Sequence, residues 1–282
     1  MSELPLTGLA ERIRSGEIGS LDATEAYLER IERLDGRIRA YITVTAESAR
    51  EQAGAADEAL ARGETLGPLH GLPVALKDNI DTAGVRTTVG SAFFADHVPE
   101  RDAEVARRLR EAGAVLLGKV TMHEFAYGAT TQNPHHGFCR NPWDLERIPG
   151  GSSGGSGAAV SAGLCAAALG TDTGGSVRIP AALNGVSALR PTNGRVSNRG
   201  VFPITWTFDT VGPLARAVAD LALVFSVLPG FDPEDPGSAN RPADEVLDRL
   251  DLGLAGLRIG VPETFFFEDV DDEVVSVVRA AA

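Results

Sequence analysis

Apolar residues recur at helical spacing over much of the first 65 residues of the chain. In the first such stretch, three apolar side chains share one helical face: Tyr27, Ile31 and Leu34. Gly36 interrupts that pattern, so we expect the helix to end there. A second stretch, rich in Ala, Glu and Arg, predicts a helix over residues 46–61. The pattern therefore predicts a helical N-terminal segment over residues 1–65.

From residue 72 onward, short apolar runs alternate with amphipathic stretches. Residues 72–76 and 114–117 are continuous apolar runs, and they predict two buried strands. Between them, residues 102–112 carry apolar side chains at helical spacing and are followed by a glycine, which predicts a helix. This alternation of strand and helix is typical of an α/β layer arrangement.

The rest of the chain continues the alternation less regularly. Residues 121–127 predict a short helix, and residues 217–228 predict an apolar helix that ends at a Pro-Gly pair. Residues 257–261 predict a strand, and residues 271–282 predict a final helix. We find no internal repeat, and we expect residues 1–282 to form a single domain.

The composition is that of an ordinary globular protein, with 43% hydrophobic and 23% charged residues. The net charge of −13 disfavours direct binding to nucleic acid or to an anionic membrane, because neutralising phosphates requires clustered basic residues. The sequence contains no apolar run long enough for a membrane span, and its N-terminus lacks the pattern of a secretion signal. Cys139 and Cys165 stand alone in the sequence, so we expect a reduced, cytoplasmic protein.

Two loops rich in glycine and serine stand near the middle of the chain, the first at residues 149–157 and the second at residues 170–180. Glycines let backbone N–H groups approach a substrate oxygen closely. A flexible linker would explain the first loop, but not the second, which carries Asp172 and Arg178. Nor would it explain the small and apolar run at residues 158–169 between them. We interpret the two loops as an active-site core, with a phosphate-binding loop as the alternative.

Lysine is rare in this chain, since of the 26 basic residues only Lys77 and Lys119 are lysines. Arginine is always protonated in proteins, whereas a buried lysine can become neutral and act as a base. Lys77 follows a predicted strand, at the kind of position where α/β proteins place functional groups. A structural salt bridge with Asp78 is the alternative for Lys77, and compositional bias is the alternative for Lys119.

The sequence motifs allow several known classes of serine, nucleotide and metal site to be considered in turn. Residues 151–155 match Gly-x-Ser-x-Gly around Ser153, but the hydrolase fold with that motif requires a histidine after the serine. All five histidines precede it, although His123 or His136 could still serve as a base in a His-Asp-Ser order. Neither a Ser-x-x-Lys motif nor a P-loop is present. His135 and His136 lack accompanying carboxylates or cysteines at ligand spacing, so we expect no metal.

The longer motifs resemble those of the amidase signature family. The resemblance rests on Lys77-Asp78 and on the two glycine-serine loops, and the separations between these motifs also fit. Further similar stretches lie at residues 141–144, 190–195 and 209–213. The likeness runs from about residue 5 to the end of the sequence.

This resemblance implies a Ser-cisSer-Lys triad. Ser176 would be the nucleophile, Ser152 the bridging serine after a cis peptide bond, and Lys77 the base. An oxyanion hole would be formed by the backbone N–H groups of four residues: Thr173, Gly174, Gly175 and Ser176. The implied reaction is amide hydrolysis through an acyl-enzyme, without a cofactor or metal. Lys119 also matches a family motif, where we expect it to have a structural role.

The resemblance further implies a mixed central β-sheet covered by helices on both faces, in a domain that lacks its C-terminal part. We expect a free-standing amidase that hydrolyses a small, non-peptide carboxylic amide, as indoleacetamide and mandelamide hydrolases do, either as a monomer or as a homodimer. This choice rests on the stretches at residues 176–183 and 203–213 and on Ile179, because the alternative subfamily usually has Gln at that position. That alternative is the A subunit of a glutamyl-tRNA(Gln) or aspartyl-tRNA(Asn) amidotransferase, a glutaminase that requires a second protein as its partner. A non-catalytic assembly partner is an alternative of another class.

Overall fold

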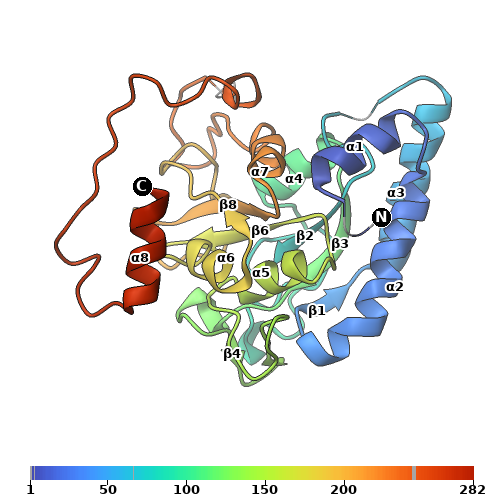
Figure 1. Cartoon of the computed structure of the whole chain (residues 1–282). Coiled ribbons are helices and arrows are strands. Elements are labelled where there is room, and N and C mark those ends of the chain that lie inside the picture. The colour runs from blue at the N-terminus through green and yellow to red at the C-terminus, as the bar shows by residue number, and fades with distance from the viewer. Residues whose placement is uncertain (1, 3, 66, 243–245) are drawn as a thin grey trace. The chain divides into compact units, whose positions relative to one another are not determined.

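The computed structural model describes residues 2, 4–65, 67–242 and 246–282 (Figure 1). Their contacts divide the chain into two units, residues 1–248 and residues 249–282, which are described separately here. The prediction of a single domain over the whole chain therefore stays a prediction. In the described ranges, no helix is both long and apolar enough to cross a membrane.

A mixed sheet runs through the first unit. Its strands are β1 (Tyr41–Val44), β2 (Pro73–Lys77), β3 (Val115–Val120), β6 (Ala167–Asp172), β7 (Ser187–Ala188) and β8 (Thr210–Ala215). Their order across the sheet is β1-β3-β2-β6-β8-β7. Strand β2 is parallel to both β3 and β6, and the remaining pairs are antiparallel. All residues of β2, β3, β6 and β8 are buried, which explains their nearly continuous runs of apolar and small residues.

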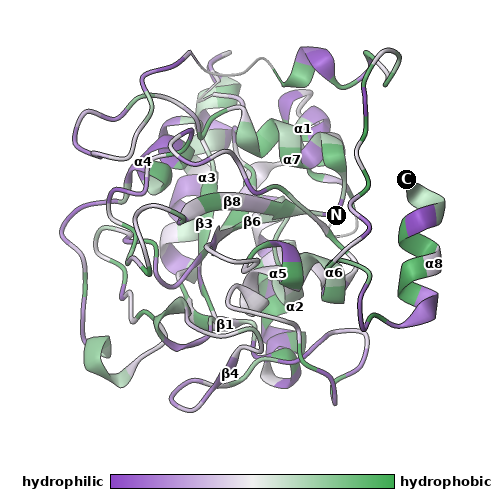
Figure 2. Cartoon of the chain, turned by 90° about the vertical axis from the view of Figure 1, so that its left-hand side faces the viewer, coloured by the Kyte–Doolittle hydropathy of each residue, from purple (hydrophilic) through white to green (hydrophobic). Residues whose placement is uncertain are grey.

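Helices cover both faces of this sheet. They are α1 (Leu6–Arg14), α2 (Ser20–Ile38), α3 (Ala46–Ala61), α4 (Glu104–Glu111), α5 (Gly154–Ser161), α6 (Arg178–Asn184) and α7 (Val218–Phe225). Figures 1 and 2 show α5 and α6 on one side of β6 and β8, with α1, α4 and α7 on the other side. Helix α5 packs across the central strands β2, β3, β6 and β8. The predicted mixed sheet between two helical layers is thus confirmed.

Short elements complete the first unit. They are the 3₁₀ turns Ala92–Phe94 and Glu124–Ala126 and the two-stranded ribbon of β4 (Gln132–Asn133) and β5 (Gly137–Phe138). A third 3₁₀ turn, Leu247–Arg249, spans the point in the sequence where the second unit begins. The helix predicted over residues 121–127 is therefore wrong, because only the turn forms there. Phe125 inside it has a φ of 52°, which a regular helix excludes.

The N-terminal segment differs from its prediction in two places. Helix α2 continues through Gly36 and ends after Ile38, where Arg39 adopts a left-handed conformation with φ 57°. Residues 41–44 form strand β1 instead of helix, because their backbone pairs with β3. The helix predicted over residues 46–61 is confirmed as α3.

The second unit, residues 249–282, contains one helix, α8 (Asp272–Ala281), among its described residues. The Asp271 carboxylate accepts a hydrogen bond from the Glu273 N–H and caps the helix. The strand predicted at residues 257–261 is wrong, because that stretch is exposed coil without strand pairing. An isolated apolar run cannot form a strand without a neighbour to complete its hydrogen bonds.

Candidate active site

Lys77 is the last residue of β2, in the middle of the sheet between β3 and β6. Its side chain is fully buried. The Nζ atom lies 2.7 Å from the Ser152 Oγ and 2.7 Å from the Thr171 Oγ1. The structure thus joins the predicted base and the predicted bridging serine directly.

Burial also changes the acidity of this lysine. Desolvation lowers the pKa of Lys77 to about 7, and the more distant carboxylates of Asp172 and Asp209 oppose this shift only in part. A lysine with this pKa is about half neutral near pH 7 and can accept a proton there. The alternative of an ion pair with Asp78 is not realised, because that carboxylate accepts hydrogen bonds from the N–H groups of Thr88 and Gly90.

The first glycine-serine loop is held by hydrogen bonds to residues at the ends of β2 and β6. Ser152 is fully buried, and its carbonyl oxygen accepts a hydrogen bond of 3.0 Å from the His123 N–H. The peptide bond between Gly151 and Ser152 is cis. A Cβ atom on Gly151 would lie only 2.7 Å from the Thr130 backbone nitrogen, so this position requires glycine. Close backbone packing, and not flexibility, therefore explains the glycines here.

The second glycine-serine loop is organised by Asp172. This buried carboxylate accepts hydrogen bonds from the N–H groups of Gly175 (2.8 Å) and Val177 (3.1 Å) and from the Arg178 guanidinium (3.0 Å). Burial alone would raise the pKa of Asp172, but these hydrogen bonds outweigh it and lower the pKa to about 2. The carboxylate stays charged and fixes the turn that leads to Ser176.

Ser176 lies where the two loops meet. Its carbonyl oxygen accepts a hydrogen bond of 3.1 Å from the Ser153 N–H. The residue is half-buried, unlike Ser152, so a substrate can reach it. Its hydroxyl makes no hydrogen bond within the described part of the chain, and so it is not joined to the Ser152 hydroxyl. The structure thus brings the three predicted residues to one place but links only Lys77 and Ser152.

The four predicted oxyanion donors differ from one another in the structure. The Gly175 N–H is occupied by the Asp172 carboxylate. The N–H groups of Thr173, Gly174 and Ser176 donate to none of the described residues, and Gly174 is exposed. Three of the four predicted backbone donors therefore have no acceptor among the described residues.

Two site residues were missed from the sequence. The Thr171 hydroxyl accepts hydrogen bonds from Lys77 and from the Asn79 Nδ2 (3.1 Å), so it orients the lysine. Asp209 accepts a hydrogen bond from the Thr173 hydroxyl and so braces the second loop. Thr171 lies near the end of β6, and Asp209 directly precedes β8. Both lie in motifs noted above, and this position was the only sign in the sequence that they belong to the site.

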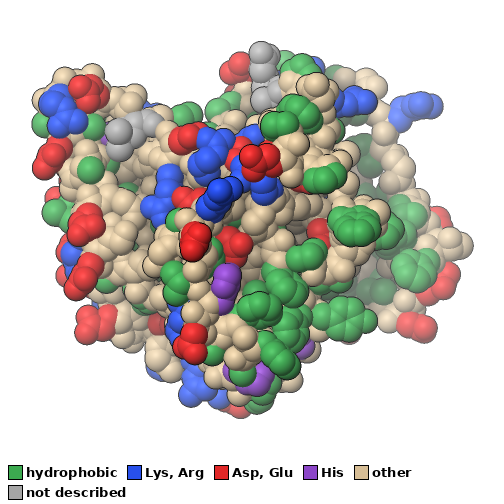
Figure 3. Space-filling view, turned by 180° about the vertical axis from the view of Figure 1, so that it is seen from behind, with side chains coloured by type: hydrophobic (Ala, Val, Ile, Leu, Met, Phe, Trp, Pro, Cys, Tyr) green, Lys and Arg blue, Asp and Glu red, His purple; other side chains and the backbone are tan. Residues whose placement is uncertain are grey.

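An aromatic cluster borders the segment after Lys77. Its rings contact one another and come from four residues: Phe93, Phe94, Phe125 and Phe202. The Phe202 N–H donates to the Asn79 carbonyl oxygen at 2.9 Å, which ties the cluster to the site. Figure 3 shows hydrophobic side chains gathered in one area of the face it displays. The hydrogen bond to Asn79 places Phe202 beside the segment that follows Lys77.

The histidines have other partners. His123 Nδ1 accepts a hydrogen bond of 3.2 Å from the Thr131 N–H, and His136 Nε2 lies 3.1 Å from the Thr88 Oγ1. In the described residues, neither ring forms a hydrogen bond with the Ser152 or Ser176 hydroxyl. The alternative of a histidine base is therefore not supported.

Comparison with known proteins decides the family. The model of the Amidase family matches residues 22–282. The chain belongs to this family. The resemblance predicted from the sequence is thus confirmed.

Three relatives of this amidase-family chain are informative. The A subunit of glutamyl-tRNA(Gln) amidotransferase from Moorella thermoacetica is 52% identical over 97% of this chain and 56% of its own length. A solved chain from a vestigial protein complex, described as revealing the evolutionary origins of an s-triazine catabolic enzyme, has a TM-score of 0.97 and 45% identity over 99% of this chain and 61% of its own. The solved A subunit of the Thermotoga maritima amidotransferase has a TM-score of 0.85 and 37% identity over 99% of this chain and 58% of its own.

These findings correct the predicted subfamily. Curated relatives that are 46 to 52% identical are glutamyl-tRNA(Gln) amidotransferase A subunits, so the prediction of a free-standing amidase is wrong. That prediction gave too much weight to Ile179. This half-buried side chain packs near Gly150 and Gly175, and a contact of that kind can change between close relatives. The chain spans 56 to 58% of the length of these curated relatives.

Proposed function

We propose that this chain is the amide-hydrolysing part of the A subunit of a glutamyl-tRNA(Gln) or aspartyl-tRNA(Asn) amidotransferase, and that it releases ammonia from the side-chain amide of glutamine. The observation that carries the proposal is the 52% identity to such a protein over 97% of this chain. The hydrogen bond of 2.7 Å between the buried Lys77 and Ser152 supports it independently.

In the proposed reaction, the Ser176 Oγ attacks the carbonyl carbon of the amide. The hydroxyl proton of Ser176 passes to Ser152, and Ser152 passes its own proton to the neutral Lys77. The C–N bond then breaks, and the proton returns along the same path to the departing nitrogen, which leaves as ammonia. Water hydrolyses the remaining ester and regenerates the Ser176 hydroxyl. The lowered pKa of Lys77, about 7, makes it a suitable acceptor for the first proton.

The developing oxyanion needs donors that are not already occupied. We assign this role to the N–H groups of Thr173, Gly174 and Ser176, which donate to none of the described residues. Removing one such donor typically costs about 3 kcal/mol of transition-state stabilisation. We assign Gly175 a different role, since its N–H holds the Asp172 carboxylate.

The proposal includes a partner protein that contacts the tRNA. The net charge of −13 gives this chain little affinity for a phosphate backbone. A partner that binds the tRNA and receives the ammonia is therefore part of the proposed function.

Ammonia release from a panel of amides tests the proposal. The purified chain is incubated with L-glutamine, L-asparagine and phenylacetamide, with Ser176→Ala as the control. We expect Ser176-dependent ammonia release that is fastest with L-glutamine. Hydrolysis of phenylacetamide without hydrolysis of either amino acid amide would contradict the proposal.

A further inference from the structure

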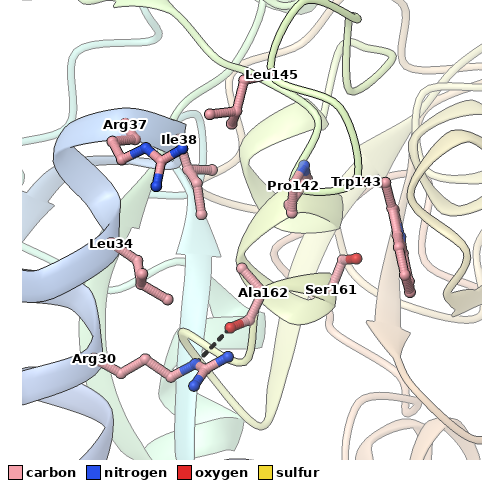
Figure 4. Close-up of a pocket in the computed structure, with 9 residues that line it drawn as sticks. All are labelled: Arg30, Leu34, Arg37, Ile38, Pro142, Trp143, Leu145, Ser161 and Ala162. Atoms are coloured by element: carbon pink, nitrogen blue, oxygen red, sulfur yellow. Dashed lines mark hydrogen bonds between the residues drawn. The ribbon is translucent and has the colours of Figure 1, made fainter.

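A cavity of about 420 Å³ lies between α2 and the end of α5, and none of its lining residues belongs to the two glycine-serine loops. Figure 4 shows Arg30, Leu34 and Arg37 extending from α2 on one side, with Trp143 and Ser161 on the other side. Its volume is in the range of small-molecule sites. The amide-hydrolysing reaction has no use for it.

Two arginines line this cavity, and neither has a carboxylate partner in the part of the chain that the structure describes. The Arg30 Nε donates to the Ala162 carbonyl oxygen at 2.7 Å, which fixes the guanidinium, and no described carboxylate pairs with it. Arg37 forms no hydrogen bond or ion pair with any of the described residues. By contrast, Arg50 lies 2.6 Å from Glu25, and Arg107 lies 2.6 Å from Glu104. No Asp or Glu is among the described residues that line the cavity, so it is positive within a chain whose net charge is −13.

The remaining walls are mainly apolar. Leu34 lies between the two arginines on α2, and the Trp143 ring is 76% exposed across from it. The Trp143 indole N–H donates to the Asn184 carbonyl oxygen at 2.9 Å, which fixes the ring and leaves its faces free. The Ser161 hydroxyl donates to the same oxygen at 2.8 Å. The guanidiniums can pair with a planar carboxylate, and the apolar walls suit an organic body attached to it.

We propose that this cavity binds a small organic carboxylate with an aromatic or branched aliphatic body. The carboxylate pairs with the guanidinium of Arg37, whose planar fork matches it with two parallel hydrogen bonds. The body packs on Leu34 and on the face of Trp143. Arg30 stands seven residues before Arg37, about 10 Å along the helix, and keeps the other end of the cavity positive.

The cavity walls are tied to rigid elements. Asn184, which accepts from Trp143 and Ser161, ends α6, and its Nδ2 donates to the Pro149 and Pro180 carbonyl oxygens at 2.7 Å. Ser161 ends α5. A site built on helix ends that are held in this way is preformed, so ligand binding requires little reorganisation.

The fluorescence of Trp143 tests the proposal directly. Trp143 and Trp206 are the two tryptophans of the chain, so Trp206→Phe leaves Trp143 as the only reporter. Titration of the 282-residue Trp206→Phe chain with phenylacetate and with isovalerate should give a saturable fluorescence change for at least one of them. The neutral 2-phenylethanol, which lacks the carboxylate, should give no saturable change.

Two arginine variants in the same background complete the test. Arg37→Gln should weaken carboxylate binding about tenfold or more, because a charge-assisted pair is lost. The matched control is Arg33→Gln, on the exposed side of the same helix and outside the cavity lining, and it should leave binding unchanged. Circular dichroism verifies that both variants are folded. The proposal is overturned if neither carboxylate binds saturably, or if the two variants affect binding equally.

Discussion

The surroundings of the two buried lysines differ in one decisive respect. Lys77 on β2 and Lys119 on β3 are both fully buried, and desolvation lowers their pKa values to about 7 and about 8. In the pairing of these parallel strands, Lys119 stands beside Leu76 and not beside Lys77. Because side chains alternate along a strand, the two lysines point to opposite faces of the sheet.

The two faces offer different partners. Lys77 donates to the hydroxyl of Ser152, in the loop that touches Ser176. Lys119 donates to the Ile80 carbonyl oxygen and to the hydroxyls of Thr82 and Thr87, all of which lie outside the two glycine-serine loops. Burial therefore lowers the pKa of both lysines, but only Lys77 lies beside a serine of the glycine-serine loops, where a base is useful.

The largest expected effect is a difference in acylation rate between substitution of Lys77 and substitution of Lys119. Lys77→Met should slow acylation of Ser176 by a fluorophosphonate about a thousandfold, because the proton acceptor is lost. Lys119→Met should change the rate less than about threefold. Mass spectrometry over time measures both rates on variants shown to be folded. An equal loss of acylation rate in the two variants would contradict the proposed functional difference between the two lysines.

A smaller effect is expected for the bridging serine. Ser152→Ala removes the hydroxyl 2.7 Å from the Lys77 Nζ, so a proton must travel without its relay. We expect the acylation rate to fall about a hundredfold. The same time course measures it, and an unchanged rate would show that Ser176 transfers its proton by another path.

The pH dependence of acylation sharpens the comparison further. Lys77 accepts a proton only when neutral, so the rate should rise about tenfold per pH unit below its pKa of about 7 and level off above it. Lys119, with a pKa of about 8, should cause no second change in the acylation rate near pH 8. Rates between pH 5 and 9 test this, and Lys119→Met should leave the profile unchanged. A rate that falls as the pH rises through 7 would contradict a lysine base.

The smallest effect concerns stability. In Lys119→Met the acceptors on Ile80, Thr82 and Thr87 lose their donor, which should lower the free energy of unfolding by about 1–3 kcal/mol. In the wild type, the folded state binds fewer protons than the unfolded state between pH 8 and about 10, because the pKa of Lys119 is lowered to about 8. The stability therefore rises with pH in that window, and Lys119→Met should reduce this rise. Urea unfolding at pH 7.5 and 9.5 measures both, and an undiminished rise would contradict this account of Lys119.

Much of this arrangement could be predicted from the sequence, because it depends on one of only two lysines and on two long glycine-serine motifs. Lys77 and the serines of the two glycine loops were identifiable from their motifs. Thr171 lies within the second glycine-serine motif, but its role in orienting Lys77 was not predicted, because it depends on the pairing of β2 with β6. The opposite directions of the two lysines follow from strand register, which includes an irregularity between Val74 and Ala75 that no local pattern predicts.

Local propensity predicts the wrong element where packing or missing neighbours decide the structure. A glycine inside a helix costs only about 1 kcal/mol, and burial of Ile38 after Gly36 carries α2 past that position. Residues 257–261 have the composition of a strand but no partner strand within the described residues. The residue at position 179 predicts the wrong subfamily, because a single side chain carries less information than 52% identity over 97% of the chain.

The most direct test of the central claim is intact-mass analysis of the purified chain after reaction with a fluorophosphonate. The account predicts a single adduct on the wild type, mapped to the peptide that contains Ser176, and no adduct on Ser176→Ala. An adduct of equal yield on Ser176→Ala, or no adduct on the folded wild type, would contradict the claim that Lys77 and Ser152 activate Ser176.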